Sequence, residues 1–298
     1  MISVIIPTFN RWPYLERCLS ALEKQTLSSK DFEVVVVDDE STDQTASCVQ
    51  KLASKVRFSL RVVNGDHKGP GQARNKGVAA ARGELIAFVD DDCEPTAGWL
   101  EAYQAAFVDS NVVWAGGPTK TIEQDVTPMT HQIVTTGMTP SPTCNLAVRK
   151  RVFDEIGGFD SAFLFSNEDG YLSFSLQDQG YRYTYVSGAI MIHPPRPLNF
   201  WKDVRRTQYL DSEFILAARL PKVYRLNRGS PWRAVFYYHL IRHYGSQLRD
   251  AFKGAPRHPW LALEAICLCT FQRLYLIWLL PGFIARALIG EYQKTNRL

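Results

Sequence analysis

The chain has 298 residues, of which 46% are hydrophobic, 21% charged and 12% aromatic. This composition is typical of a globular protein with one large or two small domains, and it excludes a disordered chain, a collagen-like repeat and a disulfide scaffold. The net charge of +4 is unevenly divided, because residues 196–298 carry 17 Lys and Arg against 6 Asp and Glu, a net of +11. This basic last third predicts an anionic partner, a membrane surface or a nucleic acid, unless it is only a solvated face.

The cysteines and the start of the chain indicate a compartment. The six cysteines include no Cys-x-x-Cys pair and no spacing suited to structural zinc, so we expect reduced thiols. The first residues, Met1–Pro7, begin a strand without a basic segment, an apolar segment or a cleavage site. We therefore expect no secretory signal and a catalytic part in the cytoplasm.

Short apolar runs and amphipathic stretches alternate in the first half of the chain. The runs, rich in β-branched residues, predict buried strands at 4–6, 32–37, 60–63 and 85–89. Helical spacing of apolar residues predicts helices at 12–26, 42–54 and 71–82, the second capped by Ser41 or Thr42. This order predicts an α/β fold with a parallel sheet and helices on both faces, in which ligands bind beyond the carboxyl ends of the strands.

The second half is more mixed. We expect a helix at 98–108, a long mobile loop at 118–142 and helices at 150–157 and 167–180. Strands are predicted at 111–116 and 143–148, and a strand pair at 182–192. From residue 198 onward, helices dominate.

The apolar stretch 261–289 is the best membrane candidate. Its apolar run is interrupted by Glu264, Gln272, Arg273, Pro281 and Arg286. No uninterrupted run reaches the roughly 18–20 apolar residues of a transmembrane helix, so we expect none. A helix lying in the membrane interface and a buried helix of a soluble domain both remain open.

Carboxylates follow two of the predicted strands. Asp38 and Asp39 come after the second, and Asp90, Asp91 and Asp92 after the fourth. Adjacent carboxylates repel one another unless a cation or a set of donors is present, and Mg²⁺ and Mn²⁺ prefer carboxylate oxygens. If the backbone stays extended, Asp90 and Asp92 point the same way and could share a metal with a diphosphate. An acidic turn before the helix at 98 is the alternative.

The glycine-rich segment 69–77 does not match a dinucleotide-binding fingerprint. Arg74 occupies the place of the third glycine, and the first predicted strand is not followed by the motif. The phosphate-loop pattern is also absent from the sequence.

Six short motifs occur in a characteristic order: Val4–Arg11, Val36–Asp43, Ala73–Gly77, Phe88–Asp92, Gly157–Asp160 and Asn167–Asp169. Together they resemble the family-2 glycosyltransferases of GT-A fold. The resemblance implies a GT-A catalytic domain at 1–195, with a nucleotide-sugar-binding half at 1–95 and an acceptor-binding half at 96–195. Residues 196–298 then form a basic, aromatic-rich helical region that could associate with a membrane.

The resemblance also implies roles for individual residues. It assigns nucleotide-sugar contacts to Pro7, Thr8, Asn10, Arg11, Asp39, Arg74, Asn75, Asp90 and Asp91. Among these, Asp39 corresponds to the carboxylate that binds a uracil-type base. The divalent metal, Mn²⁺ or Mg²⁺, falls to Asp92 and Asp90, with His193 as a further ligand or as a structural histidine.

The acidic pair Glu168 and Asp169 corresponds to the catalytic pair of the family. In a single inverting displacement, a carboxylate must take the proton of the acceptor hydroxyl while the metal neutralises the leaving diphosphate. Asp169 is the expected general base, and Glu168 would orient the acceptor or shift the pKa of Asp169. Both residues also suit a helix N-terminus, where acidic side chains are favoured.

Two departures from the family pattern are visible. Glu40 stands where glycine is common, which questions the turn after Asp39. The Gln-x-x-Arg-Trp pattern of processive synthases is missing, so we expect addition of one sugar and no polymerisation. Arg205 and Arg206 could contact donor phosphates or a lipid diphosphate, or could be ordinary surface residues.

The sequence therefore predicts a metal-dependent inverting glycosyltransferase. It would move one sugar from a nucleotide-sugar, with UDP favoured, to a lipid-linked or cell-envelope glycan, as a peripheral enzyme at the inner face of the cell membrane. The alternative is a catalytically inactive nucleotide-sugar-binding module. A nucleic-acid-binding protein ranks last, because no recognised nucleic-acid motif is present.

Overall fold

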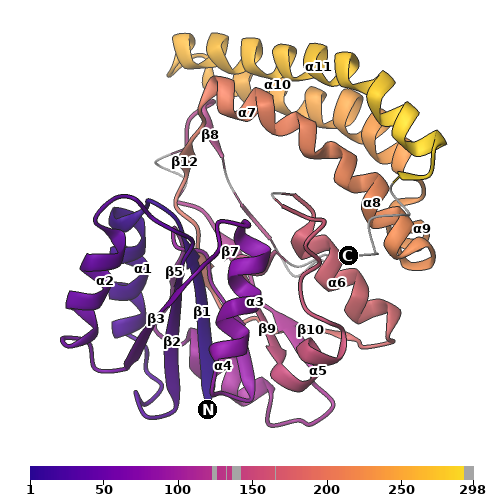
Figure 1. The fold of residues 1–298 in the computed structure, drawn as a ribbon. Helices are drawn as coiled ribbons and strands as arrows, with labels where there is room; N and C mark the ends of the chain where they lie inside the picture. The colour runs from indigo at the N-terminus through magenta and orange to yellow at the C-terminus, as the bar shows by residue number, and fades with distance from the viewer. Residues whose placement is uncertain (123–125, 132, 136–141, 165, 292–298) are drawn as a thin grey trace. The chain divides into compact units, whose positions relative to one another are not determined.

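The computed structural model describes residues 1–122, 126–131, 133–135, 142–164 and 166–291 (Figure 1). The chain divides into two compact units. The N-terminal unit consists of Met1–Ile122 and Ile133–Pro194, and the C-terminal unit of Glu123–Gln132 and Pro195–Leu298.

A seven-stranded sheet forms the centre of the N-terminal unit as far as it is described. Its strands are β1 (Ile2–Thr8), β2 (Phe32–Asp38), β3 (Ser59–Asn64), β4 (Leu85–Phe88), β6 (Trp114–Gly116), β9 (Leu146–Arg149) and β10 (Tyr183–Tyr185). The order is β10-β6-β9-β4-β1-β2-β3, and β9 alone among them runs antiparallel to its neighbours. The predicted α/β fold with a mostly parallel sheet is confirmed.

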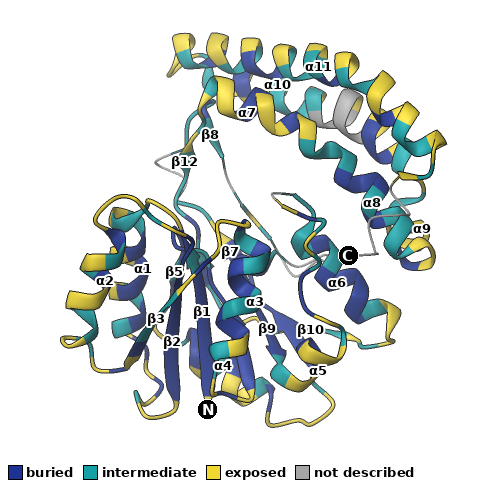
Figure 2. Ribbon diagram, viewed as in Figure 1, coloured by how far each residue is buried: buried dark blue, intermediate teal, exposed yellow. Residues whose placement is uncertain are grey.

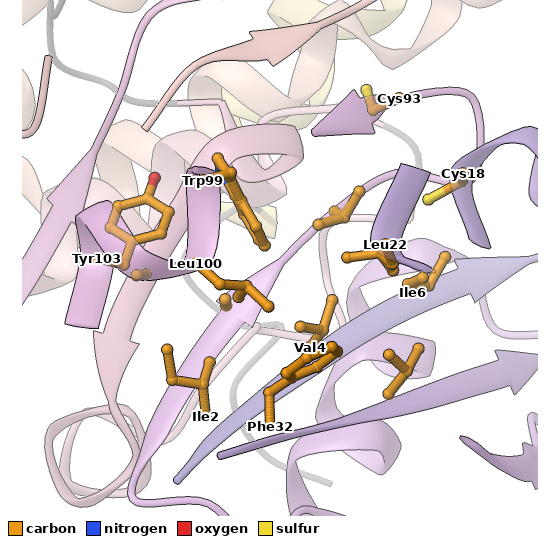
Figure 3. Packing of buried hydrophobic residues seen from close by; sticks show 14 of the residues in the cluster. Ile2, Val4, Ile6, Cys18, Leu22, Phe32, Cys93, Trp99, Leu100 and Tyr103 are labelled. Atoms are coloured by element: carbon orange, nitrogen blue, oxygen red, sulfur yellow. The ribbon is translucent and has the colours of Figure 1, made fainter. Parts of the chain in front are cut away.

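Helices cover both faces of this sheet. They are α1 (Trp12–Glu23), α2 (Thr45–Ala53), α3 (Pro70–Ala80), α4 (Trp99–Ala106), α5 (Lys150–Glu155) and α6 (Glu168–Asp178). Alternate residues of β1 point to opposite faces, so Val4 and Ile6 pack with α1, α2 and α4, whereas Ile5 packs with α3, α5 and α6. Figure 3 shows the first of these cores, in which Trp99 and Tyr103 of α4 extend the packing of the strands.

A second, three-stranded sheet lies in the same unit. It consists of β5 (Glu94–Pro95), β11 (Met191–Ile192) and β7 (Thr119–Lys120), in the order β5-β11-β7. β11 therefore pairs with β5, which follows the three aspartates, although β11 comes about a hundred residues later in the chain. This pairing brings the end of the N-terminal unit back to the fourth strand of the main sheet.

Several predicted elements differ from the structure. The strand predicted at 143–148 begins as a 3₁₀ turn, Thr143–Asn145, and the predicted pair at 182–192 is wrong because β10 and β11 belong to different sheets. The loop predicted at 118–142 contains β7 and β8 (Thr130–His131), and its residues 123–125, 132 and 136–141 lie outside the described part. These strands are two residues long, too short to leave a period in the sequence.

The C-terminal unit is helical, as predicted. Besides an antiparallel pair of β8 and β12 (Arg196–Pro197), it contains α7 (Phe200–Arg206), the 3₁₀ helix η3 (Thr207–Asp211), α8 (Ser212–Arg219), α9 (Pro221–Arg228), the π-helix η4 (Arg233–Arg242), α10 (His243–Gly254) and α11 (Pro259–Leu288). Its core includes Phe214, Val235, Leu276 and Phe283.

One helix of the C-terminal unit bears on the expectation that no segment spans a membrane. α11 is a single helix of 30 residues that continues through Pro281, and it contains an 18-residue window with a mean hydropathy of 1.5. By length and composition alone, such a helix could cross a membrane, so the expectation of no transmembrane helix stays a prediction. The charged residues interrupt the apolar run along the sequence, but they do not break the helix.

Candidate active site

Polar side chains meet where β1 and β4 end. These two strands are parallel neighbours, so their carboxyl ends lie at one edge of the sheet. The Thr8 hydroxyl donates to Asp91 Oδ2 at 2.8 Å. The Arg11 guanidinium bridges two carboxylates, with Nη1 3.0 Å from Asp91 Oδ1 and Nη2 2.6 Å from Asp92 Oδ2. The first loop and the aspartate triplet, predicted separately, thus form one hydrogen-bonded group.

Asp92 also belongs to a group of metal-ligand types. The potential ligand atoms of Asp92, Cys93 and His193 all lie within 4.8 Å of one another, and all three residues are buried. His193 Nε2 is 3.6 Å from Asp92 Oδ1, on the carboxylate oxygen that is not paired with Arg11. His193 directly follows β11, so its position depends on the pairing of β11 with β5.

Cys93 was not identified from the sequence, although it adjoins the triplet. A hydrogen bond with Cys144 and burial raise the pKa of the Cys93 thiol well above its usual value. Hard cations such as Mg²⁺ and Mn²⁺ also prefer oxygen ligands to sulfur. A carboxylate and an imidazole remain as the good ligands, and this pair fits Mn²⁺ or Mg²⁺ when the other positions go to phosphate or water.

Asp90 lies differently from Asp92. The chain turns after Asp90, since the N–H of Cys93 donates to its carbonyl at 3.0 Å, so the extended backbone that would point Asp90 and Asp92 the same way is not present. The Asp90 carboxylate instead lies 2.5 Å from Arg74 Nη2. A role for Asp90 as a metal ligand stays a prediction.

Arg74 joins the aspartate triplet to the acidic pair. It lies on α3 with only 3% of its surface exposed, and its Nη1 is 3.7 Å from Glu168 Oε1 at the start of α6. Burial lowers the pKa of this guanidinium, but the negative charges of Asp90 and Glu168 raise it by more, so the net shift is upward. The fixed positive charge therefore holds β4, α3 and α6 together at this edge.

Two carboxyl groups of the site titrate near neutrality. Burial, and then the neighbouring Asp169, raise the pKa of Glu168 to about 7 against the opposing effect of Arg74. Burial likewise raises the pKa of Asp91 to about 7, although Arg11 opposes the shift. Raised carboxyl pKa values of this kind cluster at functional sites.

Asp169 lies in the first turn of α6, next to Glu168. Its Oδ1 accepts from the N–H of Gly170 at 2.7 Å. The preceding residue, Asn167, has a φ of +63° and begins the helix in a left-handed conformation. The acidic pair therefore occupies a helix N-terminus, as expected from the sequence, and the catalytic assignment is compatible with that position.

Asn75 and Asn10 bind the protein backbone. The Asn75 amide makes two bonds with Phe159, donating to its carbonyl at 2.8 Å and accepting from its N–H at 2.9 Å. Asn10 Oδ1 accepts from the N–H groups of Thr42 and Asp43 at 2.7 and 3.1 Å. None of these four hydrogen bonds was predicted, and the nucleotide-sugar contacts assigned to Asn75 and Asn10 stay predictions.

The Asn10 contact also explains why α2 begins late. Because the N–H groups of Thr42 and Asp43 are held by Asn10, these residues lie outside the helix, and the first helical residue is Thr45. The expected caps Ser41 and Thr42 therefore do not cap α2.

Asp39 organises the loop between β3 and α3. Its carboxylate accepts from the N–H groups of Asp66, His67 and Gly69 at 3.2, 2.9 and 3.2 Å. The ring of His67 lies against that of Phe9, with centroids 4.7 Å apart. This exposed aromatic pair beside Asp39 was not identified, and single aromatic residues in loops give no sequence signal for it.

The structure brings most of the predicted site residues into this edge of the N-terminal unit. In two linked groups it gathers Thr8, Arg11, Arg74, Asp90, Asp91, Asp92, Glu168 and His193. Pro7 is the penultimate residue of β1, directly before Thr8.

Known proteins resemble this chain in sequence. Residues 3–169 match Glycosyl transferase family 2, and residues 93–286 match Glycosyl transferase family group 2. Glycosyltransferase AglE of Haloferax volcanii is 29% identical over 206 residues, which are 66% of this chain and 67% of that protein. Poly(ribitol-phosphate) beta-N-acetylglucosaminyltransferase TarS of Staphylococcus aureus is 40% identical over 109 residues, covering 37% of this chain and 19% of TarS.

A third relative is the Campylobacter jejuni GalNAc(5)-diNAcBac-PP-undecaprenol beta-1,3-glucosyltransferase, 40% identical over 33% of this chain and 32% of that enzyme. The chain thus matches about two thirds of AglE, and a third or less of the other two relatives.

Solved structures share the fold. The mannosyltransferase PcManGT from Pyrobaculum calidifontis, in complex with GDP-Man and Mn²⁺, superposes with a TM-score of 0.64 at 20% identity, covering 93% of this chain and 87% of that one. S. aureus TarS 1-349 in complex with UDP-GlcNAc gives a TM-score of 0.57 at 20% identity, covering 94% and 92%. Because the family match spans more than half of the residues and the fold agrees with it, the chain belongs to glycosyl transferase family 2.

Proposed function

We propose that this protein transfers one sugar, with inversion, from a nucleotide-diphosphate sugar to a hydroxyl group of a lipid-linked or cell-envelope glycan. The observation that carries the proposal is the link through Arg74 between the aspartate triplet and the acidic pair. A leaving diphosphate and an attacking hydroxyl need opposite chemistry, and here cation-binding carboxylates and a candidate base share one edge of a sheet.

Asp92 and His193 would hold a divalent metal, Mn²⁺ or Mg²⁺. When bound, this ion supplies positive charge to the leaving diphosphate. Asp92 Oδ1 lies toward His193, and Arg11 fixes the other oxygen at 2.6 Å, so the carboxylate is already oriented. The Arg11 side chain is 27% exposed and could bind a phosphate oxygen as well.

Asp169 would take the proton of the acceptor hydroxyl. Glu168, with its pKa raised to about 7, is partly protonated at neutral pH and can donate a hydrogen bond while its neighbour stays charged. Arg74 stabilises the charged form of the pair. A charged base next to a hydrogen-bond donor fits inversion by a single displacement.

UDP is the favoured nucleotide. Asp39 offers a carboxylate near the ends of β1 and β2, and Phe9 with His67 offers an aromatic surface beside it. The solved neighbours are in complex with UDP-GlcNAc and with GDP-Man, so both nucleotides belong in a first test.

The names of the relatives support the proposed acceptor, and the basic C-terminal region supports the proposed location. TarS acts on poly(ribitol-phosphate), and the C. jejuni enzyme on an undecaprenol-linked glycan, by their names. We place this protein at the inner face of the cell membrane, held there by its basic residues 196–298.

Replacement of the candidate base tests the proposal. With UDP-sugars, GDP-sugars and Mn²⁺, we expect Asp169→Asn to lower the rate of transfer or donor hydrolysis by about 10²–10⁴-fold, the usual contribution of general base catalysis. Asp178→Asn, an exposed carboxylate at the other end of α6, is the control and should keep the wild-type rate. Equal rates in wild type and Asp169→Asn would favour an inactive binding module.

A further inference from the structure

The solvent-facing side of α11 is almost wholly apolar. Exposed residues recur every three or four positions along it, as Figure 2 shows, and we name the following six the α11 stripe. They are Trp260, Leu263, Phe271, Leu274, Trp278 and Leu288. Trp278 is 71% exposed and Trp260 81%, and Glu264 is the one charged residue exposed on the helix as described.

The opposite side of α11 packs into the C-terminal unit. Leu276 and Phe283 are buried in its core, and Leu268 packs with Met129 and Val204. A helix at a water-exposed surface has the reverse pattern, with its polar residues outward. The stripe is therefore not explained by the packing of this unit.

The arginines of α11 are held within the unit. Arg286 Nη1 lies 2.9 Å from Asp211 Oδ2 on η3. The Arg273 guanidinium donates to the Cys269 carbonyl at 2.6 Å and lies 4.4 Å from the centroid of the Tyr244 ring. Both arginines are therefore bonded within the unit, and Glu264 with the partly exposed Arg286 are the charges on an otherwise apolar outward surface.

Cations occur instead beside the stripe. Trp201 of α7 is 61% exposed, and its ring centroid lies 6.1 Å from that of Phe271, so α7 extends the apolar surface. Lys202 follows it, and Arg257 precedes Trp260 by three residues, both exposed. Tryptophan with flanking Lys and Arg is the composition of a surface that enters the headgroup layer of a bilayer.

We propose that the α11 stripe, together with Trp201, inserts into the surface of an anionic lipid bilayer with α11 parallel to the membrane plane. The inference rests on the membrane location proposed above, and it specifies which surface of the protein binds the membrane and how α11 is oriented. The net charge of +11 in residues 196–298 complements anionic headgroups and would oppose pairing with a second copy of the same surface.

A spanning orientation is disfavoured by the neighbours of α11. Gln272 donates to the carbonyl of Asp203 on α7 at 3.1 Å, and α10 packs along α11 as well. α7 and α10 carry exposed charges, among them Lys202, Arg205 and Lys253. Each would cost about 2.5–3.5 kcal/mol at the centre of a bilayer, so α11 could not cross without separating from its partners.

Vesicle binding tests the inference. Flotation with phosphatidylcholine vesicles, with and without phosphatidylglycerol, should show binding that requires the anionic lipid. The double variant Leu274→Gln, Trp278→Gln should lower the partition coefficient by about tenfold or more, because two large apolar side chains no longer enter the bilayer. The control Leu226→Gln, on α9 and 79% exposed, should bind within about twofold of wild type.

Further outcomes overturn the inference. These are equal binding by wild type and the double variant, no binding to any vesicle, a stripe-dependent dimer that binds no lipid, or retention on vesicles in alkaline carbonate, which indicates a spanning helix. Donor hydrolysis in the absence of lipid separates this inference from the proposed function. Vesicle binding without hydrolysis would support membrane binding by the stripe and contradict the proposed enzymatic function. Hydrolysis without vesicle binding would support the enzymatic function and contradict membrane binding by the stripe.

Discussion

Glu40 adopts a backbone conformation that favours glycine. Its φ is +68°, and it lies in the turn after Asp39, where the sequence comparison with the family raised doubt about the turn. The structure retains the left-handed turn despite the side chain. A non-glycine residue in this conformation costs about 1–2 kcal/mol, so the turn must be held by its neighbours, including the bonds of Asn10 to the next loop residues.

This strain predicts a difference between two substitutions. Glu40→Gly relieves the strain but raises the entropy of the unfolded chain, whereas Glu40→Ala keeps the strain. We expect the glycine variant to be more stable than the alanine variant by about 1 kcal/mol in urea unfolding. Equal midpoints for the two variants would show that the turn is unstrained.

The raised pKa of Glu168 predicts that the stability of the fold depends on pH. Its folded pKa of about 7 lies above the unfolded value of about 4.3, so the folded state binds the proton more tightly. Stability from this group is therefore fully present below about pH 4 and is lost as the pH rises to about 7.

Glu168→Gln removes this titration. We expect the variant to gain stability relative to wild type as the pH rises from 5 to 8, from about 1 to about 4 kcal/mol, because the pKa shift is two to three units. Urea unfolding of the metal-free proteins at several pH values measures the difference. A difference that does not change with pH would contradict the assigned pKa.

At the scale of elements, Asn145 connects segments that are far apart in the sequence. Its Oδ1 accepts from Trp99 Nε1 at 2.8 Å and from the Tyr103 hydroxyl at 2.7 Å. Its Nδ2 donates to the carbonyls of Pro118 and Ala189 at 3.2 and 2.9 Å. One buried amide thus joins α4 to the segments that lead into β7 and β11, and so supports the position of His193.

Loss of this amide should be costly. Asn145→Leu leaves buried donors and acceptors without partners, each worth about 1–3 kcal/mol, and we expect a loss of about 3 kcal/mol or more in the free energy of unfolding. Asn111→Leu, at an exposed position, should change it by less than about 0.5 kcal/mol. Chemical denaturation of both variants checks the prediction, and similar losses in the two would contradict it.

Elements differ in how far the sequence predicts them. Nearly continuous apolar runs such as 32–37 gave correct strands, because a strand buried on both faces is mostly apolar, and the one charged residue of this run, Glu33, is paired with Arg61. The sequence did not predict the sheet of β5, β7 and β11, because each strand is two residues long and pairs with a segment distant in the chain.

At the scale of the whole chain, the basic charge and the exposed apolar surface occur in the same unit. The sequence predicted this unit to be helical and basic, but it treated Arg273 and Arg286 as interruptions of an apolar run. In the helix both arginines are bonded within the unit, so the outward side is apolar apart from Glu264 and the partly exposed Arg286. Which side of a helix a charge occupies depends on tertiary contacts, which a linear reading of hydropathy does not contain.

The central claim is that Asp92 and its neighbours bind a nucleotide diphosphate together with a metal ion. Titration calorimetry of UDP and GDP, with and without Mn²⁺, on wild type and Asp92→Asn tests it most directly. We expect binding of UDP that requires Mn²⁺ and that weakens about tenfold or more in the variant, since a metal-bound carboxylate is lost. Absence of binding by either nucleotide in the presence of Mn²⁺, or equal binding by wild type and Asp92→Asn, would contradict the account.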